Sequence, residues 1–147
     1  MELKEEPTPY MGEVKVRVRL FNATDEGLVR RGALKPEQVR VYETEAVVDT
    51  GAVRSILPRH VCDRLGIALV GQRVARHADG REDIVGFTEP VRFEILERDT
   101  FDDALVLGDQ VLIGQTILEK TDLLVDCRQG KVVPNPAHPD QPINNVR

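Results

Sequence analysis

The residues best suited to chemistry in this chain are Asp49, Thr50, Gly51 and Ala52, which directly follow the apolar residues 46–48. An apolar run bounded by turn-forming residues is typical of a buried strand, and Gly51 lets the chain turn at its end. The carboxylate of Asp49 is therefore expected at the rim of a core. Such a carboxylate is costly unless it is hydrogen-bonded, paired or functional.

Hydrolysis of a peptide bond by carboxylates needs two of them that share one proton. One takes a proton from water as general base, and the other donates to the carbonyl oxygen or the leaving nitrogen. Two acids held about 3 Å apart cannot both ionise, so the apparent pKa values belong to the pair. The chain has one Asp-Thr-Gly, because Asp126 after its apolar run is followed by Cys127. For this chemistry, Asp49 has to meet Asp49 of a second copy.

Most segments around this motif are predicted to be strands. Residues 13–20 alternate between apolar and mainly basic side chains, a period of two that indicates a half-buried strand. Residues 39–49 are predicted to be the strand that ends at the motif. Further strands are predicted at residues 91–96, 104–107 and 111–113, with a last hairpin formed by 123–127 and 131–133. This pattern indicates an all-β fold class.

A long hairpin is predicted between the motif and the later strands. Its arms are residues 67–75 and 82–87, and its tip contains Asp79 and Gly80. Asp-Gly between β-prone runs is a strong hairpin signal. His77, beside the tip, is expected to face solvent.

The remaining segments are shorter or irregular. Residues 59–65 are predicted to form a short helix that Gly66 closes. The connection 21–38 is long for a compact domain, and a helical turn is predicted in it at 26–34. Three acids cluster in the predicted loop between the strands at 91–96 and 104–107: Asp99, Asp102 and Asp103. Because no glycine-punctuated ligand loop accompanies them, they predict a solvated acidic turn and no metal site.

Composition excludes several classes of function. The formal net charge of −5 and the pI of about 5.3 do not indicate a nucleic-acid-binding surface. No apolar run approaches the roughly 18–20 residues of a membrane helix, and the charged N-terminus does not resemble a signal peptide. Cys62 and Cys127 are too few for a disulfide framework and lack metal-ligand spacing. A cytoplasmic protein without a cofactor, a nucleic-acid partner or a membrane anchor is therefore expected.

Asp49-Thr50-Gly51-Ala52, with an apolar pair and Pro58 soon after, resembles the motif of aspartic proteases of the retropepsin kind. Residues 111–114 (Val-Leu-Ile-Gly) are similar to the strand that packs beside the catalytic loop in that family, and 115–119 to the short helix after it. The hairpin tipped by Asp79-Gly80 lies where the family has its flap. The resemblance covers residues 13–134 and is nearest to small bacterial single-domain members, with a similar Ile-Gly-Gln and a similar Pro-Asn-Pro ending.

The resemblance implies a closed, barrel-like antiparallel protomer with one or two short helices, which forms a two-fold homodimer. Asp49 would be the catalytic acid or base, and Thr50 would hydrogen-bond to the loop of the second copy. Gly51 would let the backbone approach water and substrate, and Ala52 would pack close by. Gly114 would leave room beneath the catalytic loop.

The resemblance also implies a lid and shows two departures. Asp79 and Gly80 would close over a peptide substrate and exclude water. Retroviral members usually carry an acid after the motif and an Arg after the second glycine, and these two help to tie the dimer together. This chain has Val53 and Gln115 there. Both ends of that ion pair are absent, so no charge is left unpaired.

Three interpretations follow for a domain at residues 12–134, flanked by a flexible arm at 1–11 and a Pro-rich tail at 135–147. The first is a dimeric aspartic endopeptidase that binds extended peptides between flap and floor. The second is a retropepsin-fold peptide-binding or dimerisation module with little or no proteolysis, since fold alone does not define function. The third is a structural β domain in which Asp-Thr-Gly is only a turn.

Overall fold

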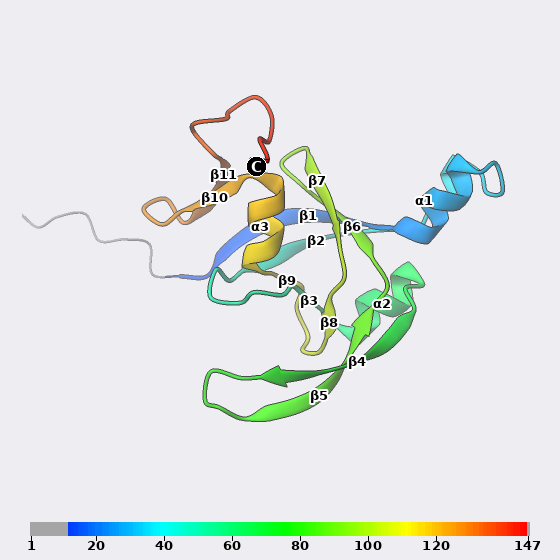
Figure 1. Cartoon of the computed structure of the whole chain (residues 1–147), viewed down its shortest axis with the longest axis horizontal. Helices are drawn as coiled ribbons and strands as arrows, with labels where there is room; N and C mark the ends of the chain where they lie inside the picture. Colours follow the sequence, from blue (N-terminus) through cyan, green and yellow to red (C-terminus); the bar gives the residue numbers. More distant parts are fainter. Residues whose placement is uncertain (1–11, 147) are drawn as a thin grey trace, which may run out of the picture.

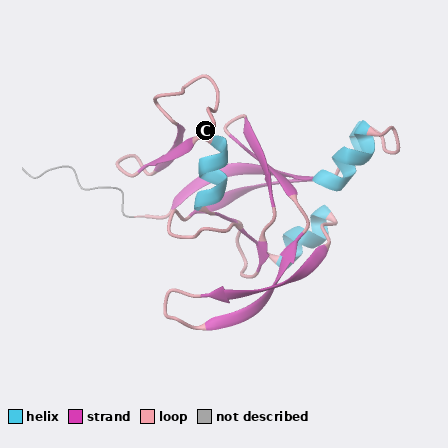
Figure 2. Cartoon of the chain, viewed as in Figure 1, coloured by secondary structure: helices cyan, strands magenta, loops and turns pink. Residues whose placement is uncertain are grey.

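The structure is a computed structural model that describes residues 12–146, so the arm expected at 1–11 lies outside the described residues. Strands dominate it (Figure 2), as the sequence predicted. Nine strands form one curled sheet, in the order β4-β5-β8-β3-β9-β2-β1-β6-β7. Their bounds are β1 Val14–Asn22, β2 Val41–Val48, β3 Ile56–Leu57, β4 Leu69–Arg76, β5 Glu82–Thr88, β6 Val91–Ile95, β7 Arg98–Asp102, β8 Leu105–Val106 and β9 Leu112–Ile113. A separate hairpin pairs β10 (Leu123–Asp126) with β11 (Lys131–Pro134).

The sheet differs in two ways from the closed antiparallel barrel that the sequence suggested. The pairs β2–β9 and β3–β8 are parallel, while the other pairs are antiparallel. Among the described residues, the edge strands β4 and β7 do not pair with each other, so the sheet is a curled half-barrel. Parallel neighbours arise because β9 and β8 return to the sheet after long connections rather than through tight turns.

Three short α-helices accompany the sheet, one more than the upper expectation of two. Helix α2 (Arg59–Leu65) has the predicted bounds and ends at Gly66, whose φ of +64° is the left-handed conformation that glycine adopts readily. Helix α3 (Gln115–Thr121) extends the expected 115–119 helix by two residues. Helix α1 (Ala23–Arg30) starts earlier than the predicted turn, because the Asn22 side chain caps it, and the 3₁₀ turn η1 (Pro36–Gln38) follows.

The prediction of a solvated acidic loop at residues 99–103 was wrong. Residues 98–102 form β7, which pairs with β6 through a two-residue turn at Leu96 and Glu97. Both turn residues have positive φ, of 50° and 64°. Such a turn normally carries Asn-Gly or Asp-Gly, so its sequence signal was absent here.

Each acid of that segment is paired with a base from another element. Asp99 lies 3.3 Å from Arg92, Asp102 lies 3.7 Å from Lys120 on α3, and Asp103 contacts Arg54. Among the described residues, no group of three or more His, Cys, Asp or Glu side chains is placed to hold a metal ion.

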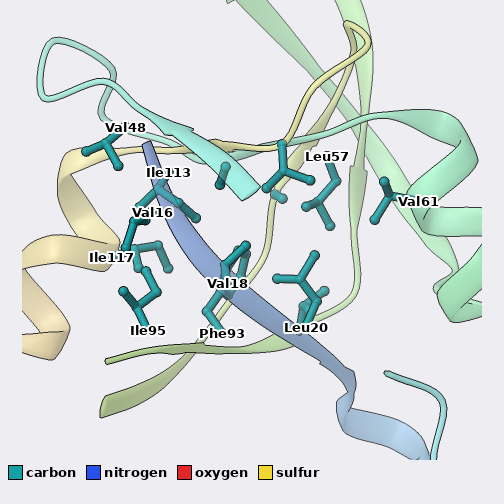
Figure 3. Packing of buried hydrophobic residues seen from close by; sticks show 14 of the residues in the cluster. Val16, Val18, Leu20, Val48, Leu57, Val61, Phe93, Ile95, Ile113 and Ile117 are labelled. Atoms are coloured by element: carbon teal, nitrogen blue, oxygen red, sulfur yellow. The ribbon is translucent and has the colours of Figure 1, made fainter. Parts of the chain in front are cut away.

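The hydrophobic core lies inside the curl of the sheet (Figure 3). Alternate residues of β1, Val18 and Leu20, are fully buried and pack with Phe93 of β6. Leu57, Ile113 and Ile117 belong to the same cluster. The predicted period-two pattern of residues 13–20 is therefore confirmed, because every second side chain faces this core. None of the helices in residues 12–146 is long and apolar enough to cross a membrane.

Candidate active site

Asp49 lies at the end of β2, and β9 fixes its backbone. The amide of Val47 donates to the carbonyl of Val111 over 2.9 Å, and the amide of Asp49 donates to the carbonyl of Ile113 over 3.0 Å. These bonds continue the parallel β2–β9 ladder up to the motif. The apolar residues before Asp49 thus act as expected, because burial of Ala46 and Val48 anchors the strand that carries it.

The loop after Asp49 turns around its own carboxylate. The Gly51 amide donates to Asp49 Oδ1 over 2.9 Å, and the Ala52 amide donates to the Asp49 carbonyl over 3.1 Å. A Cβ at position 51 would lie 3.2 Å from Asp49 Oδ1, so a larger residue would crowd the carboxylate. Asp49, Thr50 and Gly51 are all exposed in the single chain. The carboxylate is therefore oriented by its loop and open to a ligand or a second molecule.

Strand β9 passes between the two limbs of this loop. It pairs with β2 on one side and with β3, the strand after the loop, on the other. At its end, the Gly114 amide donates over 3.0 Å to the hydroxyl oxygen of Ser55, which is fully buried. Strand β9 thus connects the two ends of the loop, and this connection restrains the conformation of the loop.

Gly114 makes the close approach that the sequence predicted for it. A Cβ at this position would lie 2.7 Å from the Arg54 carbonyl oxygen and 2.9 Å from the Ala52 carbonyl oxygen. Ordinary side chains do not tolerate such distances to a backbone, so glycine is required by space and not by a left-handed φ. Position 114 therefore sets how tightly β9 packs under the Asp49 loop.

Helix α3 starts directly against the same loop. The amides of Gln115 and Thr116 donate to the carbonyls of Ala52 and Val53, over 2.7 and 3.2 Å. Two of the amides at the start of the helix, which lack partners inside it, are satisfied in this way. The Asp49 loop is consequently held from three sides, by β2, by β9 and by the first turn of α3.

The predicted hairpin is confirmed as β4 and β5, which reach away from the rest of the sheet (Figure 1). At its tip, the His77 amide donates to the Arg81 carbonyl over 2.7 Å, and the Gly80 amide donates to the His77 carbonyl over 2.9 Å. Asp79 Oδ1 accepts from the Arg81 amide over 2.9 Å, and Gly80 has a φ of +85°. Asp79 and Gly80 therefore shape the turn through local bonds and left-handed backbone.

A cleft of about 380 Å³ separates this hairpin from the Asp49 loop. Its floor includes residues 51–54, and its opposite wall includes Val74 and His77 of the hairpin. Apolar side chains are unusually exposed here, with Val53 at 69%, Val74 at 63% and Ile84 at 73%. Val74 and Ile84 are direct partners on one face of the hairpin. The cleft therefore lies beside the Asp49 loop, whose residues 51–54 line it, while Asp49 itself is not among its lining residues.

The hairpin tip and the cleft wall are formed by different residues. Asp79 and Gly80 do not line the cleft in this conformation, whereas His77 does. His77 keeps 29% of its side chain exposed, and its Nε2 lies 2.7 Å from Asp83 Oδ2, so it meets both solvent and the neighbouring strand. Ser55 was not singled out from the sequence, and its place just after the motif was the only available signal.

The two positions that depart from the retropepsin pattern carry no ion pair among the described residues. Val53 is exposed, and its carbonyl serves the first turn of α3. The side chain of Gln115 donates to Glu119 Oε1 over 3.3 Å, along its own helix. Any contact with a second copy at these positions would therefore be made by an apolar side chain and an amide.

Neither a protein-family model nor a curated protein matches this chain.

Proposed function

We propose that the protein is an aspartic endopeptidase, in which Asp49 of two identical chains forms the catalytic dyad. The observation that carries the proposal is the Asp49 loop, whose carboxylate is exposed and oriented by the Gly51 amide. Strand β9 and the first turn of α3 also restrain this loop. The cleft between loop and hairpin supplies room for a substrate.

The proposed chemistry explains why a second copy is required. One Asp49 carboxylate would be ionised and take a proton from water, and its counterpart would donate a proton to the peptide carbonyl. The Gly51 amide donates a hydrogen bond to Asp49 Oδ1 and so orients this carboxylate. Because the chain has a single Asp-Thr-Gly, two-fold pairing of exposed Asp49 loops is the simplest arrangement that brings two such acids together.

The proposed substrate is an extended peptide segment. The hairpin edge and the floor of the cleft can bind backbone groups as an added strand does. Val53 and Val74 offer apolar contacts to its side chains. Closing of the β4–β5 hairpin would exclude water from the reacting carbonyl.

A substitution of the proposed catalytic acid tests this function. Wild type and Asp49→Asn are incubated with a diverse peptide mixture from about pH 4 to pH 7 at high protein concentration, and cuts are identified by mass spectrometry. Asp63→Asn is the matched control, since it removes a carboxylate that is 70% exposed on α2. Defined cuts by wild type and by the control, but not by Asp49→Asn, are expected. Equal cleavage by all three would refute the proposal.

A second candidate is a peptide-binding or dimerisation module with little or no proteolysis. The residues that favour it are Val53 and Gln115, which stand where retroviral retropepsins usually carry a pair of charges that tie the dimer together. A dimer that binds peptide without cutting it, observed by analytical ultracentrifugation in the same samples, would support this candidate over the endopeptidase.

A further inference from the structure

Asp122 ends α3 and collects three hydrogen bonds from the tail of the chain. Its carboxylate accepts from Asn135 Nδ2 over 2.9 Å, from His138 Nδ1 over 2.6 Å and from the Ile143 amide over 3.1 Å. The Asn135 amide also donates to the Asp122 carbonyl over 3.1 Å. Figure 1 shows the tail looping back to this end of α3. One side chain thus fixes three points of a segment that has no regular secondary structure.

Arg98 of β7 holds the same junction from the other side. It is 6% exposed, and its Nη1 donates to the carbonyls of Thr121 and Asp122 over 3.3 and 2.8 Å. Its Nη2 donates to the carbonyl of His138 over 2.6 Å. A cation at the C-terminal end of a helix is favoured by the helix dipole. Arg98 therefore joins the sheet, the end of α3 and the tail.

The backbone of Asp122 adopts a left-handed conformation that ends the helix. Its φ is +56°, in the left-handed region that few residues other than glycine, asparagine and aspartate adopt. Hydrogen bonds from Asn135 and Ile143 lower the pKa of its carboxyl to about 2, so it is ionised above that pH. Arg98 from β7 and the imidazole of His138 from the tail face it, and Glu119 and Lys120 precede it on its own helix.

Helix α3 links this junction to the Asp49 loop. Its first turn donates to the carbonyls of Ala52 and Val53, and its last residue precedes Asp122. Between these two ends, the side chains of Ile117 and Leu118 are buried in the core and hold the helix against the sheet. So short a packed helix moves as one body, and a restraint at its end acts on its beginning.

We propose that residues 135–146 form a latch closed by Asp122 and Arg98, and that the closed latch positions the Asp49 loop through α3. Asp122 is in this sense a positioning residue that touches neither the loop nor the cleft. The latch does not depend on the proposed proteolysis, because its closure is a property of the single chain. It gives the Pro-rich tail a defined role as the part of the chain that locks the far end of the helix.

The test is amide hydrogen exchange followed residue by residue by NMR, in the full chain under native conditions. The variant is Asp122→Asn, which keeps a residue tolerant of positive φ but replaces an acceptor of three bonds by a group with one acceptor oxygen. Asp140→Asn is the matched control, since Asp140 is an exposed acid of the same tail and no hydrogen bond of it is recorded within residues 12–146. Exchange at Val18, in the core, reports on global unfolding.

The expected result has two parts. In Asp122→Asn, the Ile143 amide exchanges at least about tenfold faster than in wild type and in Asp140→Asn, as the loss of a charge-assisted bond requires. The Gln115 and Thr116 amides also exchange faster, while Val18 does not change. An Ile143 amide that is unprotected in wild type would overturn the latch. Faster exchange at Ile143 with unchanged Gln115 and Thr116, or an equal rise at Val18, would overturn its action on the loop.

Discussion

The hydroxyl of Ser55 accepts a hydrogen bond from the Gly114 amide over 3.0 Å, and both residues are buried. This bond joins the outgoing limb of the Asp49 loop to the end of β9, two segments far apart in the chain. Asp49 itself bonds to β9 on the incoming limb. Both limbs of the loop are therefore hydrogen-bonded to β9 or to the residue that follows it, and the conformation of the loop depends on both attachments.

Replacement of Ser55 by alanine is expected to destabilise the protein by about 1–3 kcal/mol, because the buried Gly114 amide loses its acceptor. Urea unfolding measures the change in the free energy of unfolding. Thr24→Ala removes a hydroxyl that bonds to Glu89 at the surface and is the control, with an expected cost below about 1 kcal/mol. An equal loss in the free energy of unfolding for the two variants would show that the Ser55–Gly114 bond stabilises the protein no more than a surface hydrogen bond does.

Replacement of Gly114 by alanine is expected to cost about 1–3 kcal/mol, because its Cβ would meet the Arg54 carbonyl oxygen at 2.7 Å. The resulting shift should also move the Asp49 loop and lower any peptide cleavage. Gly27→Ala in α1 is the control. Its Cβ would have ordinary contacts from 3.5 Å, and alanine favours a helix by about 0.5–1 kcal/mol. Thermal melts of both variants test the prediction, which is wrong if Gly114→Ala melts no lower than wild type.

Mixing wild type with Asp49→Asn tests whether two copies share one active site. At equal amounts and after subunit exchange, about a quarter of the dimers carry two Asp49 side chains. Cleavage by a fixed amount of wild type should then fall to about half of its value alone. Addition of Asp63→Asn in place of Asp49→Asn should cause no such fall. An unchanged rate with Asp49→Asn would show that each chain works by itself.

The ion pair of Asp25 with Arg40, in the connection between β1 and β2, is expected to make the stability of the protein sensitive to acid. Asp25 is 5% exposed, and its carboxylate accepts from Arg40 Nε over 2.9 Å and from the Arg40 amide over 3.0 Å. The side-chain hydrogen bond from Arg40 is the main cause that lowers the pKa of Asp25. A lowered pKa in the folded state means that this stabilisation is present above the unfolded-state pKa of about 3.9 and is lost as the pH falls below it.

Asp25→Asn is therefore expected to be less stable than wild type by about 1–3 kcal/mol near pH 6, with a smaller difference near pH 3. Urea unfolding at several pH values measures both. Glu43→Gln is the control, because Glu43 pairs with Arg17 at the exposed surface. A difference between wild type and Asp25→Asn that stays constant from pH 6 to pH 3 would contradict the assignment of the acid-sensitive stabilisation to this pair.

Local chemistry in the sequence was sufficient for the elements whose signals lie within a few residues. The alternation of residues 13–20 predicted β1, Gly66 predicted the end of α2, and Asp79-Gly80 predicted the turn between β4 and β5. The same holds for Asp49, which the preceding apolar run placed at the end of a strand. In each case the side chains that favour the local backbone conformation lie within the element or turn that adopts it.

Only the tertiary structure decided which distant segments meet. The parallel pairing of β2 with β9 and the Ser55–Gly114 bond depend on how the sheet curls, because each joins segments far apart in the chain. The turn at Leu96 and Glu97 adopts positive φ without the residues that favour it, because the pairing of β6 with β7 outweighs the local preference. The attachment of the tail to Asp122 likewise has no local signal, because its donors and its acceptor come together only when α3 packs on the core.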